Sequence, residues 1–188
     1  MEGVFMMTNE KIIELVKNTL VLAGSTFSED KKAAYKKAIS AESNETAKWI
    51  LETILANAQV AEKNASPLCD DSGIPHIVLE IGPNAIVTGE MLKSIKKGIA
   101  EGLRILPGRP MGILGNDRQK IDQSIGLDSD PAGVEPSPIL LRETKEDTVR
   151  LHILMFGGGP AIRAKTYRVF HKHNAQIVID EIGRASCR

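Results

Sequence analysis

The chain is poor in cysteine, with only Cys69 and Cys187 among its 188 residues. Two cysteines so far apart give no disulfide framework, which excludes the class of small disulfide-stabilised secreted domains. No apolar run approaches the ~20 residues that a membrane-spanning helix needs. The first residues also lack the basic segment, apolar core and cleavage site of a secretory leader. We therefore expect a cytoplasmic protein with no membrane partner.

The chain has no excess of charge of either sign, since 24 basic residues balance 24 acidic ones. A polyanion-binding protein usually carries a basic field, so nucleic acid is not an expected partner. The sequence also contains no internal repeat and no low-complexity segment. Its content of 42% hydrophobic and 26% charged residues is ordinary for a globular protein. The length suits one domain, or one domain and part of a second.

Nucleotide-binding motifs are absent as well. Residues 157–159 form a triple glycine after an expected strand, with Lys165 beyond it. Such a loop lets backbone N–H groups approach an anion, although a flexible turn is the alternative. It lacks the Gly-Lys-Ser/Thr ending of a P-loop and the GxGxxG spacing of dinucleotide-binding proteins. The four histidines show no metal-ligand spacing.

Apolar residues at helical spacing predict three helices in the first third of the chain. The expected ranges, each begun by a capping residue, are 8–24, 28–40 and 44–63, and a fourth helix is expected over 88–106. The apolar stripe of the third helix consists of Trp49, Ile50, Ile54, Leu55 and Ala58. We expect such stripes to face the core, with a subunit interface as the alternative.

The remaining pattern mixes strands with weakly patterned segments. Residues 76–82 predict a buried strand, and residues 138–144 and 148–156 predict a hairpin. Residues 111–137 predict a long loop with short pieces of structure, and a last helix is expected after Asn174. The expected fold is therefore α+β, with N-terminal helices followed by a mixed, mainly antiparallel sheet and flanking helices.

Reactive groups gather in residues 66–76, SPLCDDSGIPH, which place a thiol beside two carboxylates, a hydroxyl and a glycine. Pro67 and Pro75 disfavour regular structure, so we expect a shaped loop that presents these groups together. The alternative is a plain turn in which Cys69 is a small buried side chain. Arg109 follows the end of a predicted helix, where it could bind a carboxylate bidentately or hold the last helical carbonyls.

Two consecutive motifs resemble one family. The helix motif E-x-x-x-x-A-K-x-I-L-E-x-I-L-x-N, from Glu42 to Asn57, precedes A-x-P-L-C-D-D-S-G. Together they resemble the α-type catalytic domain of iron–sulfur hydro-lyases, which comprise the class I fumarate hydratases and the L-tartrate dehydratase α subunit. Residues 155–159 are similar to the strand-to-glycine loop of that family. The family loop usually reads P-x-C-Q-D-T-G, so Asp70 and Ser72 depart from it.

The resemblance implies an enzyme that reversibly adds or eliminates water on a small hydroxy-dicarboxylate. It implies a [4Fe–4S] cluster that is held by three cysteines and leaves one iron open as a Lewis acid. Cys69 would be a cluster ligand and Asp71 a catalytic residue. The implied substrate-binding residues are Asp70, Asp71, Arg109, Gly158, Gly159 and Lys165. A β-type subunit or C-terminal domain would complete the enzyme, and a homo- or hetero-oligomer is expected.

The domain expected from this resemblance covers residues 1–181, the N-terminal part of the α-type domain. Residues 182–188, IGRASCR, are expected to be a non-native tail on a truncated gene, because a common sequencing adapter translates to the same letters. Cys187 is then either a cluster ligand or part of that tail, and the fragment alone is expected to be inactive. Two alternative functions remain: a small-anion binding or interaction domain in which Cys69 is structural, and a thiol-dependent enzyme that pairs Cys69 with a histidine.

Overall fold

The computed structural model describes residues 7–106, 108–109, 111–122, 124–134, 138–158 and 168–186. Its elements in chain order are α1 (Asn9–Ser25), α2 (Glu29–Ala41), α3 (Glu45–Asn64), β1 (Ile74–Ile81), α4 (Gly89–Ile105), α5 (Asp117–Asp122), the 3-10 turn η1 (Pro131–Gly133), β2 (Leu140–Glu143), β3 (Val149–Phe156) and α7 (Ala175–Ser186). No helix among these is long and apolar enough to span a membrane.

The four expected helices before residue 107 are confirmed, and three of them start at a side-chain cap, whereas the Ser28 side chain makes no capping hydrogen bond at the start of α2. Thr8, Asn44 and Thr88 each accept a hydrogen bond from a backbone N–H in the first turn of α1, α3 and α4, respectively. These bonds satisfy donors that a helix start leaves without an intrahelical partner. The last expected helix is also confirmed, since α7 begins directly after Asn174, whose side chain accepts from the Gln176 N–H. Helix α7 runs from Ala175 to Ser186 and so crosses the expected boundary between residues 1–181 and the tail 182–188. That boundary stays a prediction.

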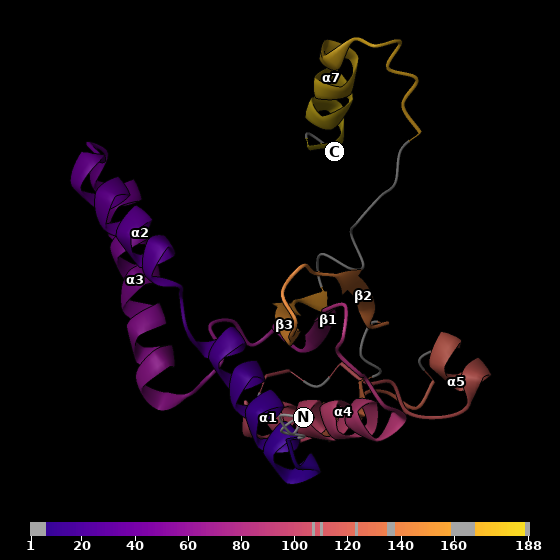
Figure 1. Ribbon diagram of the computed structural model, residues 1–188. Coiled ribbons are helices and arrows are strands. Elements are labelled where there is room, and N and C mark those ends of the chain that lie inside the picture. Colours follow the sequence, from indigo (N-terminus) through magenta and orange to yellow (C-terminus); the bar gives the residue numbers. More distant parts are fainter. Residues whose placement is uncertain are drawn as a thin grey trace.

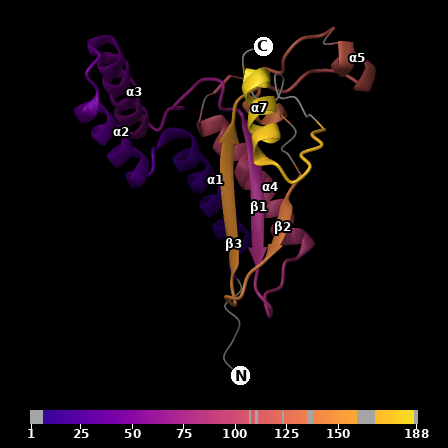
Figure 2. The same ribbon diagram turned by 90° about the horizontal axis from the view of Figure 1, so that it is seen from above.

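The sheet has the order β2-β1-β3, with β1 in the middle (Figure 2). Strand β1 pairs with β2 in parallel over four residues and with β3 antiparallel over eight. The expected α+β fold with a mixed, mainly antiparallel sheet is therefore confirmed.

The expected hairpin is wrong, because β1 lies between its two strands. The segment that joins β2 to β3 passes around the end of β1, where the Thr144 N–H donates to Ile81 and the Gly82 N–H donates to Thr148. A Cβ on Gly82 would lie 2.2 Å from the Glu146 carbonyl oxygen, so only glycine permits this crossing. Strand β1 occupies the centre because its alternate residues Ile77 and Leu79 are fully buried, whereas β2 is short and exposed.

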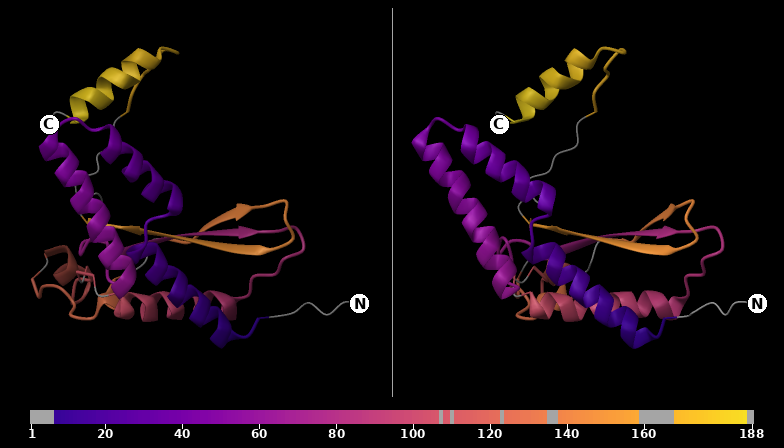
Figure 3. Two further views of the ribbon diagram at one scale, coloured as in Figure 1. Left: turned by 90° about the vertical axis from the view of Figure 1, so that its left-hand side faces the viewer. Right: turned by 60° about the vertical axis from the view of Figure 1, so that its left-hand side comes forward.

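One face of the sheet is covered by α1 and α4, and no described helix packs directly on the opposite face, which lies on the side of α7 (Figures 1 and 3). The buried core lies between the covered face and the two helices, and consists of Ile12, Val16, Leu20, Ile77, Leu79, Ile95, Ile99, Leu103 and Leu106. Helices α1 and α4 approach closely at Gly98, where an added Cβ would lie 2.7 Å from the Ile13 carbonyl oxygen. The core therefore depends on the absence of a side chain at this crossing.

Helices α2 and α3 form an arm beside this body (Figure 2). Helix α2 buries no residue, and α3 buries only Ala58 and Ala61. Ala58 of the expected α3 stripe is buried, but Trp49 is 64% and Ile50 45% exposed, so the expectation that the stripe faces the core is wrong for its N-terminal part. Periodicity identifies an apolar face but not what covers it, and only the C-terminal half of α3 reaches the body. The alternative role of this stripe as a subunit interface stays a prediction.

Candidate active site

The cysteine loop connects α3 to β1 and is shorter than expected, because β1 already begins at Ile74. Its backbone is held from two sides just before Cys69. The Leu68 N–H donates to the Gly24 carbonyl at the end of α1 (2.8 Å), and the Asn57 amide of α3 donates to the Leu68 carbonyl (3.1 Å). The loop therefore has a defined path relative to both helices.

Within the loop, two short turns direct the polar side chains outward. The Ser72 N–H donates to the Cys69 carbonyl and the Gly73 N–H to the Asp71 carbonyl, each at 3.0 Å. Cys69 is an exposed free thiol, so its alternative reading as a buried structural residue is wrong. Gly73 is buried, and a Cβ there would lie 3.0 Å from the Arg109 carbonyl oxygen. The loop thus presents a thiol and two carboxylates at the surface.

Arg109 comes to this loop from the end of α4. Its guanidinium lies between two carboxylates, with Nη2 3.3 Å from Asp70 Oδ2 and Nη1 3.3 Å from Asp71 Oδ1. Its backbone N–H donates to the Asp70 carbonyl. Three of the predicted site residues, Asp70, Asp71 and Arg109, therefore lie together in the structure, although 39 positions separate Asp70 from Arg109.

Gly158, at the end of β3, lies near the cysteine loop, with the Met111 side chain between them. A Cβ on Gly158 would lie 3.5 Å from the Met111 sulfur, and a Cβ on Gly73 would lie 3.2 Å from it. Met111 therefore packs between the glycine loop and the cysteine loop. Gly159, Lys165 and Cys187 lie outside the described residues, so their predicted roles remain predictions.

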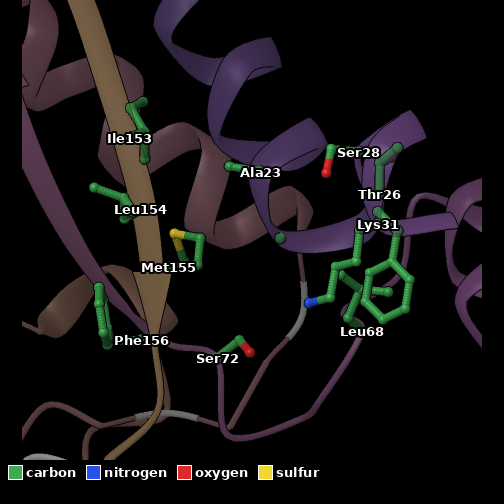
Figure 4. Close-up of a pocket in the computed structure, with 12 residues that line it drawn as sticks. Ala23, Thr26, Ser28, Lys31, Leu68, Ser72, Ile153, Leu154, Met155 and Phe156 are labelled. Carbon is green, nitrogen blue, oxygen red and sulfur yellow. The ribbon is translucent and has the colours of Figure 1, made fainter. Parts of the chain in front are cut away.

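A cavity of about 550 Å³ opens beside the cysteine loop (Figure 4). Its walls come from the α1–α2 junction, the loop and the end of β3, and include Phe27, Lys31, Leu68, Ser72 and Met155. This volume lies in the range of small-molecule sites. Lys31 contributes a cation that no sequence signal marked, and its ammonium also lies 4.2 Å from the centre of the Phe27 ring.

The described residues do not form a metal-cluster site, since no three His, Cys, Asp or Glu residues among them group around one point. A [4Fe–4S] cluster of the implied type needs three thiolates, and Cys69 is the only cysteine in the described ranges. The exposed Cys69 thiol fits one ligand position. The donor set as described is therefore incomplete.

Nothing in the described structure favours a Cys–His enzyme. The ring of His76 packs against Phe156 with centroids 4.6 Å apart, and His152 Nε2 lies 3.2 Å from Glu80. His171 and His173 pack edge-to-face against each other. None of these histidines hydrogen-bonds to Cys69, so the geometry gives the thiol no activating base.

The fold and this geometry define a class of protein: an α+β domain that gathers a thiol, two acids and an arginine beside a cavity of small-molecule size. The family model described as fumarate hydratase (fumerase) matches residues 13–187. The chain therefore belongs to the fumarate hydratase (fumerase) family.

Two relatives share parts of the chain. A putative L(+)-tartrate dehydratase subunit alpha from Methanocaldococcus jannaschii is 33% identical over 136 residues, which cover 71% of this chain and 47% of the relative. A putative fumarate hydratase class I from Geobacillus stearothermophilus is 27% identical over 152 residues, which cover 80% of this chain and 28% of the relative. The match thus spans about half of the first relative and just over a quarter of the second.

Proposed function

We propose that this chain is the N-terminal part of an iron–sulfur hydro-lyase that reversibly adds water to, or eliminates it from, a small hydroxy-dicarboxylate. One observation carries the proposal: Arg109, Asp70 and Asp71 meet beside the exposed Cys69 thiol, in a chain of the fumarate hydratase family. Arginine is suited to bind a carboxylate because its planar donors match the two oxygens.

In this proposal, the candidate residues bind the substrate and move its proton. Arg109 orients a substrate carboxylate, and the backbone at Gly158 and Gly159 donates further hydrogen bonds to the substrate, with Lys165 as an additional cation. Asp71 moves the proton on the carbon next to the carboxylate, which places it as the catalytic acid or base. Its side chain is 29% exposed and ion-paired with Arg109, so its position is restrained.

Cys69 is proposed to bind one iron of a [4Fe–4S] cluster in the complete enzyme. When bound, such a cluster supplies a Lewis acid for the substrate hydroxyl. The other thiolates would have to come from outside the described residues, because a single described cysteine cannot hold the cluster.

A β-type portion is the proposed partner. The tartrate dehydratase relative is named as a subunit alpha, which implies a second kind of subunit for that protein. We propose the same arrangement here, either as a separate chain or as a C-terminal domain.

The experiment is anaerobic reconstitution of the full-length protein with its β-type portion, followed by assays with fumarate, malate and tartrate. We expect turnover of at least one of them, and we expect Arg109→Met to raise KM about 10- to 100-fold, because a charge-assisted hydrogen bond to substrate is lost. Glu90→Gln, which removes a carboxylate from an exposed ion pair elsewhere, is the control. No turnover of any of the three acids, with iron and sulfide fully incorporated, would overturn the proposal.

A further inference from the structure

Asp70 is fixed beside Arg109 by main-chain contacts as well as by charge. The Arg109 N–H donates to the Asp70 carbonyl, and Gly108 lies so close that an added Cβ would be 3.3 Å from the same oxygen. The ion pair between the two side chains is therefore a consequence of the backbone path.

The ion-paired group formed by Arg109, Asp70 and Asp71 carries a surplus of negative charge. Asp70 and Asp71 together carry two negative charges, and Arg109 carries one positive charge. A dicarboxylate that binds to Arg109 has to displace one carboxylate and approach the other. The Asp70 side chain is 71% exposed and the Asp71 side chain 29%, so Asp70 is the carboxylate that is freer to move aside.

The Asp70 carboxylate can also accept a hydrogen bond, but only from a ligand that carries a hydroxyl group. An ionised Asp accepts hydrogen bonds and donates none, so it can bind a substrate hydroxyl but not a second carboxylate. An unsaturated dicarboxylate has no hydroxyl and meets only repulsion from Asp70. A hydroxylated dicarboxylate can offset that repulsion by donating its O–H to Asp70.

We propose that Asp70 is a specificity-determining residue, which competes with a substrate carboxylate for Arg109 and accepts a hydrogen bond from a substrate hydroxyl. The site then favours hydroxylated dicarboxylates over unsaturated ones. This inference rests on the function proposed above, because it assumes that the ligand of Arg109 is a dicarboxylate.

The test is calorimetric titration of the 188-residue chain and its Asp70→Asn variant with fumarate and with L-tartrate. Asn keeps the shape of Asp and removes its charge. Removing one like charge at about 5 Å in largely solvated surroundings should tighten fumarate binding about tenfold. Tartrate binding should change much less, since the loss of repulsion is offset by the loss of a strong acceptor. The ratio of the fumarate Kd to the tartrate Kd should therefore fall about tenfold.

Glu90→Gln is the matched control, because it also removes an exposed carboxylate from an ion pair, with Lys93 at 2.6 Å. Glu90 lies at the far end of α4, about 25 Å along the helix from the Arg109 end, and should leave the ratio unchanged. If the ratio of the fumarate Kd to the tartrate Kd is the same in the wild type and in the Asp70→Asn variant, this inference is overturned and the proposed function stands. Failure of both proteins to bind either acid overturns this inference, because Asp70 then has no ligand to select, whereas the proposed function is decided separately by the assay of the reconstituted full-length enzyme.

Discussion

The crossing of α1 and α4 at Gly98 is the part of the fold on which the site most depends. Both chain segments that meet at the site are attached to this helix pair: the Gly24 carbonyl of α1 accepts a hydrogen bond from the Leu68 N–H of the cysteine loop, and α4 leads to Arg109. Gly24 itself lies against Leu106 at the end of α4, since an added Cβ would be 2.2 Å from a Leu106 methyl carbon. Replacing Gly98 by alanine tests whether this close approach sets the stability of the domain.

The expected size follows from two opposing effects. Alanine is favoured over glycine in a helix interior by about 1 kcal/mol. Against this, a Cβ at position 98 would lie 2.7 Å from the Ile13 carbonyl oxygen and 2.7 Å from the Val16 Cβ, and neither neighbour can rotate away. Overpacking of this kind costs up to about 3 kcal/mol, so Gly98→Ala should destabilise the chain by about 2 kcal/mol.

Urea unfolding followed by far-UV circular dichroism measures the effect. With an m-value of about 2 kcal/mol/M, the midpoint should fall by about 1 M. Two other glycines of α4 provide a graded control. A Cβ on Gly102 would lie 3.1 Å from the Leu20 side chain, so Gly102→Ala should be close to neutral, and Gly89 has nothing within 4 Å, so Gly89→Ala should not destabilise. If Gly98→Ala is as stable as Gly89→Ala, the reasoning about this crossing is refuted.

Two further predictions concern the loop and the open face of the sheet. Asn57→Ala removes the hydrogen bond to the Leu68 carbonyl and should lower the unfolding free energy by about 1 kcal/mol. Amide hydrogen exchange in the cysteine loop should become faster. Unchanged exchange would show that Asn57 does not hold the loop. The hydrogen bond from His152, then the charges of His152 and Arg150, lower the pKa of Glu80 below its usual 4.5. A carboxyl whose pKa is lowered by folding stabilises the protein above its unfolded pKa and loses that contribution as the pH falls through the folded value. Below about pH 4.5 the unfolding free energy of the wild type should therefore fall more steeply than that of Glu80→Gln, and parallel curves would contradict the assignment.

Helices and their starts could be predicted from the sequence because they depend on local signals. The caps at Thr8, Asn44 and Thr88 and the stripe through Val16 and Leu20 act within one helix, and the structure confirms them. The existence of the cysteine loop was also predictable from Pro67 and the polar residues after it, but its end was not, because Pro75 lies within β1 instead of in the loop.

The strand order and the contacts within the site depend on distant parts of the chain. Strands β2 and β3 are adjacent in sequence, but β1, whose Ile77 and Leu79 are fully buried, takes the central position between them. The pairing of Asp70 with Arg109 and the packing of Met111 between two glycines require the α1–α4 crossing to be in place. No local pattern indicates such contacts. Met111, Lys31 and the anchoring bond of Asn57 were therefore found only in three dimensions.

The iron content of the reconstituted full-length enzyme and its Cys69→Ser variant tests the central claim most directly. The account predicts that the wild type binds a [4Fe–4S] cluster and turns over a hydroxy-dicarboxylate, whereas Cys69→Ser loses the intact cluster and the turnover. Glu90→Gln, which removes a carboxylate from the exposed ion pair with Lys93 at the other end of α4, should retain both. A Cys69→Ser enzyme that keeps its iron and its full activity would contradict the assignment of the cysteine loop as the active site.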